Sequence, residues 1–407
     1  MKRPLKIAFI TEMYSEKMGY SENFLPKAVA RLGHEVHVIA STAQVYFNSP
    51  SYKKTYEPFL GPNIVAPGTK EIDGYTLHRL PLKPAIRKNV IRLEGLKPLL
   101  EQLAPDIIQA FNIYSVTCYE AALIAEETGA RFFTESHVHA SVFDMRDPKT
   151  RLRHLLLGFP RKLKVINRIT EKHYPIAKDV AKISLECFGV PPEKTDLQSL
   201  GVDTGLFTPV VTPEDELQRA RKREELGFTA QDIVCIYTGR LTADKNPQCL
   251  ARAVRYLRKE GHARFKALFV GSGTPEDMTA LRSVDGCVVH PFVKVNELPF
   301  FYRAADIGVW PRQESMSQLD ATACGLPIIV SDHVEVTERI EGNGLLYKED
   351  DEQDLAEKIL NLENAALRRD MALRGRKKVE DQFSWDALAK RRINDFEQSL
   401  DKKGPKA

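Results

Sequence analysis

The sequence predicts an α/β protein built from two Rossmann-like, doubly wound domains, and three observations lead to this prediction. The chain has 407 residues, which is too long for one ordinary core and about right for two domains. Short apolar runs alternate with helical patterns in both halves, as they do in successive β-α-β units. A stretch rich in Gly, Thr and Pro at residues 201–216 separates the two series, and this composition is typical of a linker.

The first domain, which we assign to residues 1–205, begins with a β-α-β unit. Residues 6–10 form a short apolar run, as expected for a buried parallel strand. Residues 22–32 place apolar side chains at helical spacing, and Gly33 suits the position after a helix C-terminus. Residues 35–40 then alternate like a strand. Further strands and helices are predicted within residues 106–111, 130–136 and 165–177.

The second domain, which we assign to residues 206–385, shows the same alternation of strand and helix. Apolar residues 233–239 predict its first strand, and residues 248–261 predict the helix that follows. Residues 385–400 have the pattern of an amphipathic helix. The remaining predicted strands are 265–273, 287–293, 307–311 and 327–332, and the remaining predicted helices are 276–283, 297–305 and 319–325.

Composition excludes several classes of protein. The net charge is only +4, so the chain is not expected to bind nucleic acid. The six cysteines are scattered without a C-x-x-C pair, so neither a zinc site nor a disulfide framework is indicated, and a reducing compartment is expected. The apolar run at residues 7–10 is too short for a signal peptide, and no stretch reaches the ~20 apolar residues that span a bilayer. We therefore expect a cytoplasmic protein without an integral membrane segment.

Two cations follow the first strand of the second domain. Arg240 and Lys245 come after Gly239, and Pro247 stands where a helix begins. In tandem Rossmann-like domains, ligands bind in the cleft at the carboxyl ends of the strands. Two cations beside the electropositive N-terminus of a helix suit a doubly charged anion such as a diphosphate. On charge alone, a solvated basic loop is the simpler interpretation.

A series of segments in a fixed order resembles one family. Residues 237–254, YTGRLTADKNPQCLARAV, resemble the phosphate-binding segment of retaining nucleotide-sugar glycosyltransferases of the GT-B fold, the family 4-like or "group 1" enzymes. The resemblance extends over nearly the whole chain and implies two Rossmann-like domains that face each other across a cleft. It also implies that the C-terminal helix, 386–407, crosses back to complete the first domain. The other matching segments are 32–40, 200–209, 268–277, 292–311, 321–332, 342–347 and 383–391.

The resemblance implies a hexosyltransferase that uses a nucleoside diphosphate sugar and retains the anomeric configuration. Arg240 and Lys245 would hold the donor diphosphate and stabilise the negative charge that develops on it as the sugar leaves. No D-x-D motif occupies a convincing position after a predicted strand, so neither a metal nor a cofactor is expected. Residues 271–273 (GSG) lack the third glycine of a dinucleotide fingerprint, because Glu276 stands in its place. A nicotinamide enzyme is therefore not expected.

The donor-sugar motif departs from the family pattern, in which two glutamates are separated by seven residues. Here Glu314 and Asp320 are separated by five residues. Asp320 aligns with the second acid, which fixes the ribose, and Glu314 is the candidate for the first acid, which touches the sugar. An ungapped alignment would place Arg312 there instead. Serines and a methionine replace the usual glycines, and Ser317 is among the expected donor contacts.

Two histidines follow a predicted strand of the first domain. Residues 132–141, FFTESHVHAS, resemble the segment with the family's cleft histidine, and His137 is the first choice and His139 the second. His137 would hydrogen-bond the donor sugar. Gly19 lies in the loop after the first strand, where glycine lets the backbone approach a ligand closely. The other donor contacts that the resemblance implies are Gly239, Gly271 and the backbone of Phe292 and Val293. Backbone contacts leave the nucleotide base open.

The acceptor is the least specified partner, and we expect a carbohydrate, a lipid-linked molecule or another small acceptor. Residues 146–168 mix Arg and Lys with the apolar run LLLGF. A basic, partly apolar helix can lie on an anionic membrane surface, so contact with the inner face of a membrane is one interpretation. The other, which we favour, is a solvated helix whose leucines pack inward.

Two other functions fit the same fold. A nucleotide-sugar 2-epimerase would alter the sugar and leave the nucleotide linkage intact. A non-catalytic, degenerate transferase would serve as a binding or assembly subunit, and the shortened acidic motif is the sequence feature that supports it. The intact pair of Arg240 and Lys245 argues against that role.

Overall fold

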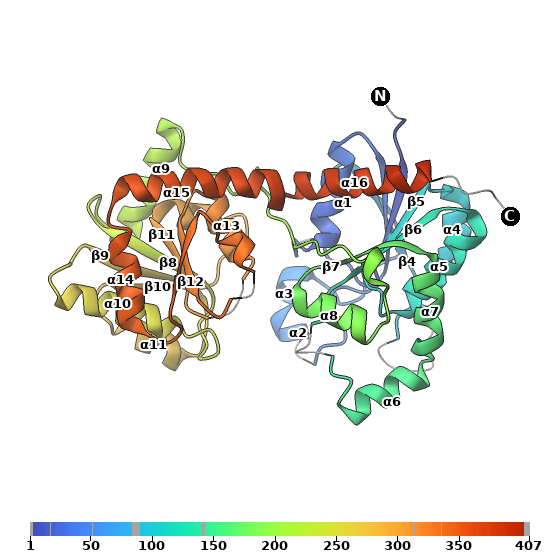
Figure 1. Ribbon diagram of the computed structural model, residues 1–407, viewed down its shortest axis with the longest axis horizontal. Helices are drawn as coiled ribbons and strands as arrows, with labels where there is room; N and C mark the ends of the chain where they lie inside the picture. The colour runs from blue at the N-terminus through green and yellow to red at the C-terminus, as the bar shows by residue number, and fades with distance from the viewer. Residues whose placement is uncertain are drawn as a thin grey trace. The chain divides into compact units, whose positions relative to one another are not determined.

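The computed structural model describes residues 3–16, 18–50, 52–83, 90–139, 143–312, 315–334 and 336–402. The chain divides into two compact units (Figure 1). Unit 1 consists of Met1–Leu200 together with Trp385–Ala407, and unit 2 consists of Gly201–Ser384. The boundaries predicted from the sequence are 205/206 and 385/386.

Within the described residues, unit 1 is built around a seven-stranded sheet with the order β3-β4-β2-β1-β5-β6-β7. β3 pairs antiparallel with β4, and the other neighbours pair in parallel. The chain order reverses beside β1, which lies between β2 and β5, and ligands bind at such a point in doubly wound sheets. The strands are β1 Lys6–Ile10, β2 Glu35–Ser41, β3 Gly68–Ile72, β4 Tyr75–Leu80, β5 Ile107–Ala110, β6 Arg131–Ser136 and β7 Thr170–Pro175.

The sheet of unit 1 has a hydrophobic core on each face. Along β1, Ile7 and Phe9 pack into one core with residues of α1 and α16, whereas Ala8 and Ile10 pack into the other with residues of α5 and α7. This alternation follows from the two-residue period of a strand, and it confirms a doubly wound arrangement. The helices are α1 Ser21–Arg31, α2 Tyr52–Thr55, α3 Glu57–Leu60, α4 Leu96–Leu103, α5 Val116–Thr128, α6 Pro148–Leu156, α7 Phe159–Ile169, α8 Lys178–Glu186, the short 3-10 helix Pro192–Lys194 and α16 Trp385–Asp401.

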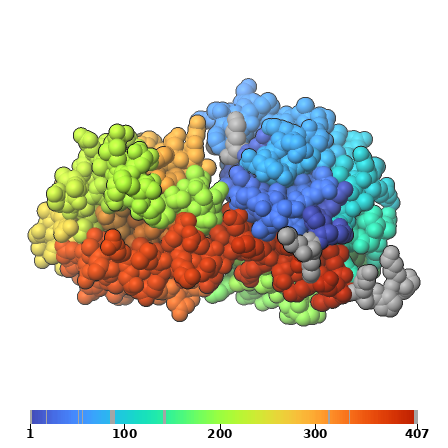
Figure 2. Space-filling view, turned by 90° about the horizontal axis from the view of Figure 1, so that it is seen from above, coloured from blue at the N-terminus to red at the C-terminus, as the bar shows by residue number. Residues whose placement is uncertain are grey.

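The C-terminal helix α16 belongs to unit 1, as the resemblance implies. It packs against α1 (Figure 1), and its outer side stays at the surface of the unit (Figure 2). Phe24 of α1 stacks on Trp385 with ring centroids 5.9 Å apart, and the Phe396 ring lies 4.6 Å from the Phe133 ring. The far end of the chain therefore completes the core of unit 1.

Within the described residues, unit 2 contains a six-stranded parallel sheet with the order β10-β9-β8-β11-β12-β13. The strand order again reverses beside the first strand, β8, which lies between β9 and β11. The elements are α9 Pro213–Glu225, β8 Ile233–Arg240, α10 Pro247–Lys259, β9 Phe265–Ser272, α11 Pro275–Arg282, β10 Cys287–His290, α12 Leu298–Ala304, β11 Ile307–Trp310, α13 Ser317–Ala323, β12 Ile328–Ser331, a 3-10 turn Thr337–Arg339, β13 Gly344–Tyr347, α14 Glu352–Asn361, α15 Ala365–Lys378 and the π-helical turn Val379–Phe383.

The predicted linker at 201–216 is wrong in its last part, because α9 begins at Pro213. Thr212 caps this helix: its hydroxyl accepts the Asp215 N–H at 3.1 Å, and the Asp215 carboxylate accepts the Thr212 N–H at 3.0 Å. Proline suits the first position of a helix, and the reciprocal cap satisfies two exposed N–H groups. The Thr and Pro that suggest a linker are thus a helix start.

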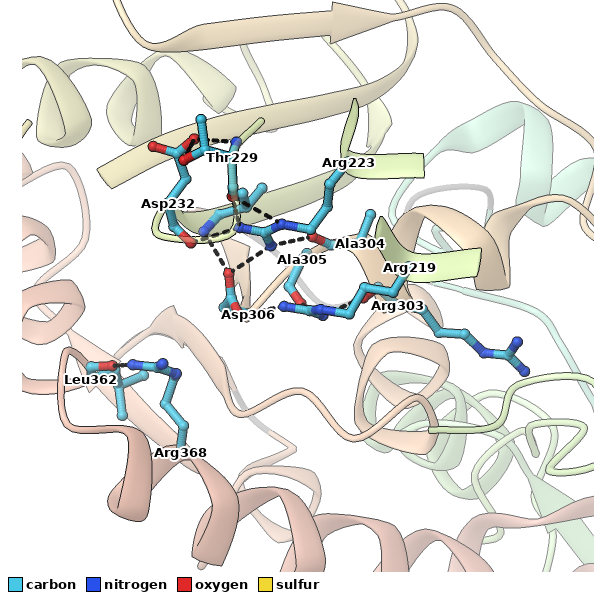
Figure 3. A network of polar contacts seen from close by, with 11 residues as sticks. Arg219, Arg223, Thr229, Asp232, Arg303, Ala304, Ala305, Asp306, Leu362 and Arg368 are labelled. Carbon is cyan, nitrogen blue, oxygen red and sulfur yellow. Dashed lines mark hydrogen bonds and ion pairs between the residues drawn. The ribbon is translucent and has the colours of Figure 1, made fainter. Parts of the chain in front are cut away.

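Two arginines of α9 fasten this helix to the start of the sheet (Figure 3). Arg223 donates to one carboxylate oxygen of Asp306 at 3.2 Å and to the carbonyl of Thr229 at 2.8 Å, and Arg219 donates to the other Asp306 oxygen at 2.7 Å. Asp306 also accepts the backbone N–H of Val234 at 2.8 Å, at the beginning of β8. The network lies at the amino ends of β8 and β11, so the opposite, carboxyl ends of the strands are left for a ligand.

Candidate functional site

A pocket of about 240 Å³ lies at the carboxyl end of β8 in unit 2. Its lining brings together Gly239, Arg240 and Lys245, which the sequence predicts as donor contacts. We call it the donor pocket. The other lining residues are Tyr237, Thr238, Trp310, Arg312 and Ser315.

Glycines shape the ends of the two strands beside this pocket. Gly239 of β8 and Gly271 of β9 are register partners. A Cβ atom on Gly271 would lie 1.8 Å from the carbonyl oxygen of Gly239, which no side chain can tolerate. The predicted role of Gly271 as a donor contact stays a prediction, because the structure shows a packing reason for this glycine.

Arg240, the first of the two predicted phosphate-binding cations, is largely exposed and forms a weak ion pair. The Arg240 side chain is 66% exposed, and its guanidinium lies 3.3 Å from the Asp244 carboxylate. A surface ion pair of this kind contributes little to the stability of the fold. Burial lowers the pKa of Lys245, Asp244 opposes this shift and Arg240 adds to it. An anion in the pocket would relieve the mutual repulsion of Arg240 and Lys245.

Arg312 is a third cation of the donor pocket. From the sequence it was considered only because an ungapped alignment places it at the position of the family's first acid. Its Nε donates to Asp350 at 2.9 Å, and Glu349 lies 3.6 Å away. Asp350 also accepts a hydrogen bond from Asn246, just before α10, at 2.7 Å. The charge of Arg312 is therefore neutralised by these two acids. The sequence signal for this residue was an arginine directly after the predicted strand 307–311, two positions after the end of β11.

The acidic motif is described only in part. Glu314 lies outside the described residues, so its predicted contact with the sugar stays a prediction. Ser317 and Asp320 lie on α13 and do not line the donor pocket within the part of the chain that the structure describes. Burial raises the pKa of Asp320 to about 8, so its carboxyl is protonated at neutral pH before a ligand binds.

The predicted base-binding turn follows β10. Phe292 is 74% exposed, whereas Val293 is buried in the core of unit 2. An exposed aromatic ring beside the carboxyl ends of the strands is available for stacking. The backbone contact to a base is not tested by this arrangement and stays a prediction.

In unit 1, His137 directly follows β6 and is held by a buried network. Its Nε2 lies 2.7 Å from Glu135 Oε1 and 3.4 Å from the Ser21 hydroxyl at the start of α1. Arg392 of α16 donates to the other Glu135 oxygen at 2.8 Å and to Gln109 at 2.8 Å. The sequence analysis did not identify Glu135 or Arg392. We call these two residues the buried pair.

The buried pair fixes the charge state around His137. Burial acts to raise the pKa of Glu135, but Arg392 and His137 outweigh it, and the pKa lies below its usual value. Burial acts to lower the pKa of His137, but the hydrogen bond to Glu135 outweighs it, and the pKa is raised. The ring is thus oriented, with a proton on Nε2, by an ionised carboxylate.

The other predicted residues of unit 1 are placed differently. His139 pairs through Nδ1 with Asp179 of α8 at 3.0 Å, so a different carboxylate holds it, and its place as second choice stays a prediction. Gly19 lies in the loop after β1 with a φ of +70°, and a Cβ there would lie 3.2 Å from the Phe24 ring. Glycine suits this backbone, and a ligand contact there is not tested.

One acid at the carboxyl edge of unit 1 was missed altogether. Glu12 follows β1 by two residues, and Asn112, just after β5, donates to its carboxylate at 3.2 Å. Burial raises the pKa of Glu12 to about 7. A carboxyl poised near neutrality at a switch point is suited to hydrogen-bonding a hydroxyl ligand. Its position beside the first strand was the signal.

Helix α6 differs from the interpretation that we favoured for the basic region. Leu152, Leu155 and Leu156 are 57%, 63% and 56% exposed, so the inward packing predicted for the leucine run is wrong for Leu155 and Leu156, whereas Leu157 packs against the core of unit 1. α6 buries His154, which lies against the rings of Tyr114 and Phe159, and α7 buries Leu163 and Ile166. A short break at Leu157 and Gly158, the latter with a φ of +67°, separates the two helices.

Within the described residues, no helix combines the length and the apolar character that a membrane crossing requires. The part of the chain that the structure describes also shows no group of three or more His, Cys, Asp or Glu side chains that could hold a metal ion. All six cysteines are free thiols.

Comparison with sequence families and relatives gives consistent matches. Residues 232–364 match the family model described as "Glycosyl transferases group 1". A "D-inositol 3-phosphate glycosyltransferase" of Xylanimonas cellulosilytica is 26% identical over 54% of this chain and 55% of that protein. A "GDP-mannose-dependent monoacylated alpha-(1-6)-phosphatidylinositol monomannoside mannosyltransferase" of Corynebacterium glutamicum is 30% identical over 51% of this chain and 57% of that protein. The chain spans about half the length of these relatives.

Solved structures show the same fold over the whole chain. A glycosyltransferase from Rickettsia africae matches with a TM-score of 0.70 and 15% identity, over 99% of this chain and 100% of that one. Anabaena HepE in complex with UDP matches with a TM-score of 0.66 and 17% identity, over 97% and 100%. These likenesses confirm the predicted GT-B fold.

Proposed function

We propose, from the premise that this chain belongs to the GT-B glycosyltransferases, that it transfers a hexose-type sugar from a nucleoside diphosphate sugar to an acceptor hydroxyl with retention of configuration. The single observation that supports this most is the donor pocket, where Arg240, Lys245 and Gly239 meet at the carboxyl end of β8. The relatives named above are glycosyltransferases, and one solved neighbour binds UDP. Neither an epimerase nor a non-catalytic subunit is favoured by any of these comparisons.

The chemistry asked of the pocket is stabilisation of a leaving diphosphate. The acceptor oxygen bonds to the anomeric carbon on the face from which the diphosphate leaves, the bond from that carbon to the phosphate oxygen breaks, and the acceptor proton passes to the departing phosphate. One close cation–phosphate pair is worth ~4 kcal/mol at an effective dielectric near 20. Only the part that strengthens in the transition state accelerates the reaction, and each ~1.4 kcal/mol of it gives tenfold.

In this proposal His137 hydrogen-bonds the donor sugar, and Asp320 binds the nucleotide ribose. The reaction needs neither a metal nor a cofactor, because the two cations supply the positive charge that a metal would otherwise bring. The acceptor is a carbohydrate, a lipid-linked sugar or another small molecule, and the protein acts in the cytoplasm.

Substitution of the cations tests the proposal. A thermal-shift screen first identifies the donor, because a ligand at about 100 times its dissociation constant adds ~2.7 kcal/mol of stability. With that donor, Arg240→Ala and Lys245→Ala are each expected to reduce turnover at least about tenfold, which corresponds to ~1.4 kcal/mol of lost transition-state stabilisation. The matched control is Arg374→Ala, since Arg374 is likewise exposed and pairs with an aspartate four residues away.

The results separate the possible outcomes. Unchanged turnover in both variants would remove the donor site that we propose. A product in which the sugar is altered but still linked to the nucleotide would indicate an epimerase. Full turnover in the presence of excess EDTA supports a metal-independent reaction, and the anomeric configuration of the product, read by NMR coupling constants, tests retention.

We also propose that α6 brings unit 1 to the inner face of an anionic membrane. The three exposed leucines of α6 share one short helix with Lys149, Arg151 and Arg153. An apolar strip beside cations fits the boundary between lipid headgroups and acyl chains, where each nearby cation contributes ~1 kcal/mol.

Flotation with vesicles tests this membrane contact. Replacement of all three leucines, Leu152, Leu155 and Leu156, by serine is expected to abolish binding to anionic vesicles without loss of stability, because these side chains lie outside the core. The matched control replaces Leu217, Leu367 and Leu373 of unit 2, which are also exposed. Absence of binding by the unaltered protein would rule the membrane contact out.

A further inference from the structure

A second pocket, of about 330 Å³, lies in unit 1 beside β4. We call it the Arg79 pocket. It is lined by polar side chains of Glu16, Gln44, Thr69, Lys70 and Arg79 over the apolar floor of Leu77. Arg79 is the penultimate residue of β4, and Glu16 and Gln44 belong to the loops that follow β1 and β2. The pocket therefore opens at the carboxyl edge of the sheet, where ligands bind in this class of fold. The donor pocket uses other residues, all in unit 2.

Arg79 is the unusual member of this pocket, because its charge is buried and no ion pair to it is found among the described residues. The residue is only 8% exposed. Its guanidinium donates to the carbonyl oxygens of Ser41 at 2.9 Å and Ala43 at 3.5 Å, and it lies 5.0 Å from the centre of the Tyr14 ring. Within the described residues, no carboxylate lies within ion-pair distance of Arg79. A guanidinium has five N–H donors, and two carbonyls do not saturate them.

A buried cation without an anionic partner is unfavourable unless something compensates it. Burial lowers the pKa of Arg79, and the more distant carboxylate of Glu16 opposes that shift. The two carbonyl oxygens that Arg79 contacts are neutral and do not supply the opposite charge. The charge itself therefore indicates a ligand that carries the opposite charge.

The rim of the pocket offers a second cation. Lys70 donates to Glu16 at 2.8 Å, and both side chains are largely solvent-accessible. Gln44 is already satisfied, since it donates to the Leu60 carbonyl and accepts from Ser15. The lining thus has two cations, Arg79 and Lys70, against one carboxylate, Glu16, and Lys70 can turn from this exposed partner to a bound anion at little cost.

We propose that the Arg79 pocket binds the phosphate group of a small phosphorylated ligand. The Arg79 fork takes two phosphate oxygens, because a planar guanidinium matches phosphate geometry, and Lys70 closes over the group from the rim. The volume suits a compact molecule such as a monosaccharide phosphate. The ligand is either an acceptor of the proposed transfer or a separate effector. Binding itself does not depend on the proposed function.

Direct binding tests this pocket without any need for activity. The double variant Arg240→Ala/Lys245→Ala provides the background, because it removes the other candidate phosphate site. Calorimetry with glucose 6-phosphate, glycerol 3-phosphate and inorganic phosphate is compared with glucose and glycerol. We expect the phosphorylated probes to bind and the parent alcohols not to bind. Absence of binding by every phosphorylated probe at about 10 mM, well above a weak millimolar dissociation constant, would overturn the proposal.

Substitutions on this background show which residues bind. Arg79→Gln is expected to weaken binding at least about tenfold, which is ~1.4 kcal/mol, and Lys70→Ala to weaken it several-fold. Lys27→Ala is the control, since Lys27 is another surface lysine of unit 1 that pairs with an acid, Asp73, at 3.0 Å. If Arg79→Gln fails to fold, the affinities of Lys70→Ala and of the charge-retaining Arg79→Lys for the probes test the assignment instead. Affinity that neither Lys70→Ala nor Arg79→Lys changes would overturn the assignment.

Mass spectrometry distinguishes the two sources of the phosphate. The unaltered protein is incubated with its donor and the probe that binds best. A gain of one sugar mass identifies the probe as an acceptor, whereas an unchanged probe that alters the rate with another acceptor identifies an effector. Both results support the pocket. Binding without any transfer to any acceptor would contradict only the proposed function.

Discussion

The donor pocket in unit 2 and the buried pair in unit 1 arrange charge in opposite ways. Arg240 is 66% exposed and forms a weak pair with Asp244 at 3.3 Å. Glu135 and Arg392 are 2% and 5% exposed and lie 2.8 Å apart. Arg392 is further held by Gln109 and Gln198. One site has charge that a ligand can neutralise, and the other is neutralised by the protein itself.

This difference separates binding groups from positioning groups. A cation that must grip and release a diphosphate can remain hydrated between turnovers, so it needs no permanent partner. A histidine that must present one nitrogen in one direction needs a fixed carboxylate behind it, and a buried carboxylate needs a fixed cation. Glu135 and Arg392 are thus positioning residues for His137, and the C-terminal helix supplies one of them.

The largest effect is expected from breaking the buried pair. Arg392→Met keeps much of the side-chain volume but leaves Glu135 buried without its cation, which typically costs about 3–5 kcal/mol. Arg391→Met is the control on the same helix, since Arg391 is half exposed and lies 3.8 Å from Asp196. Unfolding in urea, with native-state binding of the donor as a check of unit 2, measures both. If Arg392→Met lowers the free energy of unfolding by less than about 1 kcal/mol, as expected for an exposed pair, the buried pair does not stabilise unit 1 as we infer.

The sequence predicts the strands and loops that carry the sites better than it predicts which side chains pair with one another in them. The apolar strands predict both sheets. Arg240 and Lys245 line one pocket because Arg240 ends the first strand of unit 2 and Lys245 lies in the loop that follows it. Arg392 and Glu135 are 257 residues apart in the chain. Neither local periodicity nor the spacing of motifs contains the information that they meet. Arg312 was likewise ambiguous, because its partner Asp350 comes from the segment after β13.

A second effect concerns two acids, Glu135 and Asp320, whose pKa values move in opposite directions. Burial acts to raise the pKa of Glu135, but the charge of Arg392 outweighs it and the pKa is lowered. Burial raises the pKa of Asp320 to about 8. The folded state therefore holds a proton on Asp320 that the unfolded chain has lost above its ordinary value near 3.8. The stability that Asp320 contributes is fully present below that value and is lost as the pH rises through about 8.

Asp320→Asn tests this difference because asparagine is neutral at every pH. The free energy of unfolding of the unaltered protein is expected to fall, relative to the variant, by more than about 1.4 kcal/mol between about pH 4 and about pH 9, which is one pKa unit. Glu135→Gln is the comparison, and its difference from the unaltered protein should change in the other direction, since a lowered pKa adds stability above the ordinary value. A pH-independent difference for Asp320→Asn would show that this carboxyl is ionised in the fold.

The smallest effect is expected for the stability of the donor-pocket variants. Arg240→Ala should change the free energy of unfolding by no more than about 0.5 kcal/mol, because the exposed pair with Asp244 contributes little and no core contact is lost. The same variant should lose the stabilisation that a nucleoside diphosphate gives the unaltered protein, which is ~2.7 kcal/mol at about 100 times the dissociation constant. Thermal unfolding with and without nucleotide measures both quantities in one experiment. A variant that is strongly destabilised without nucleotide would show that Arg240 supports the fold. Arg240 would then not differ from the buried pair in its contribution to stability.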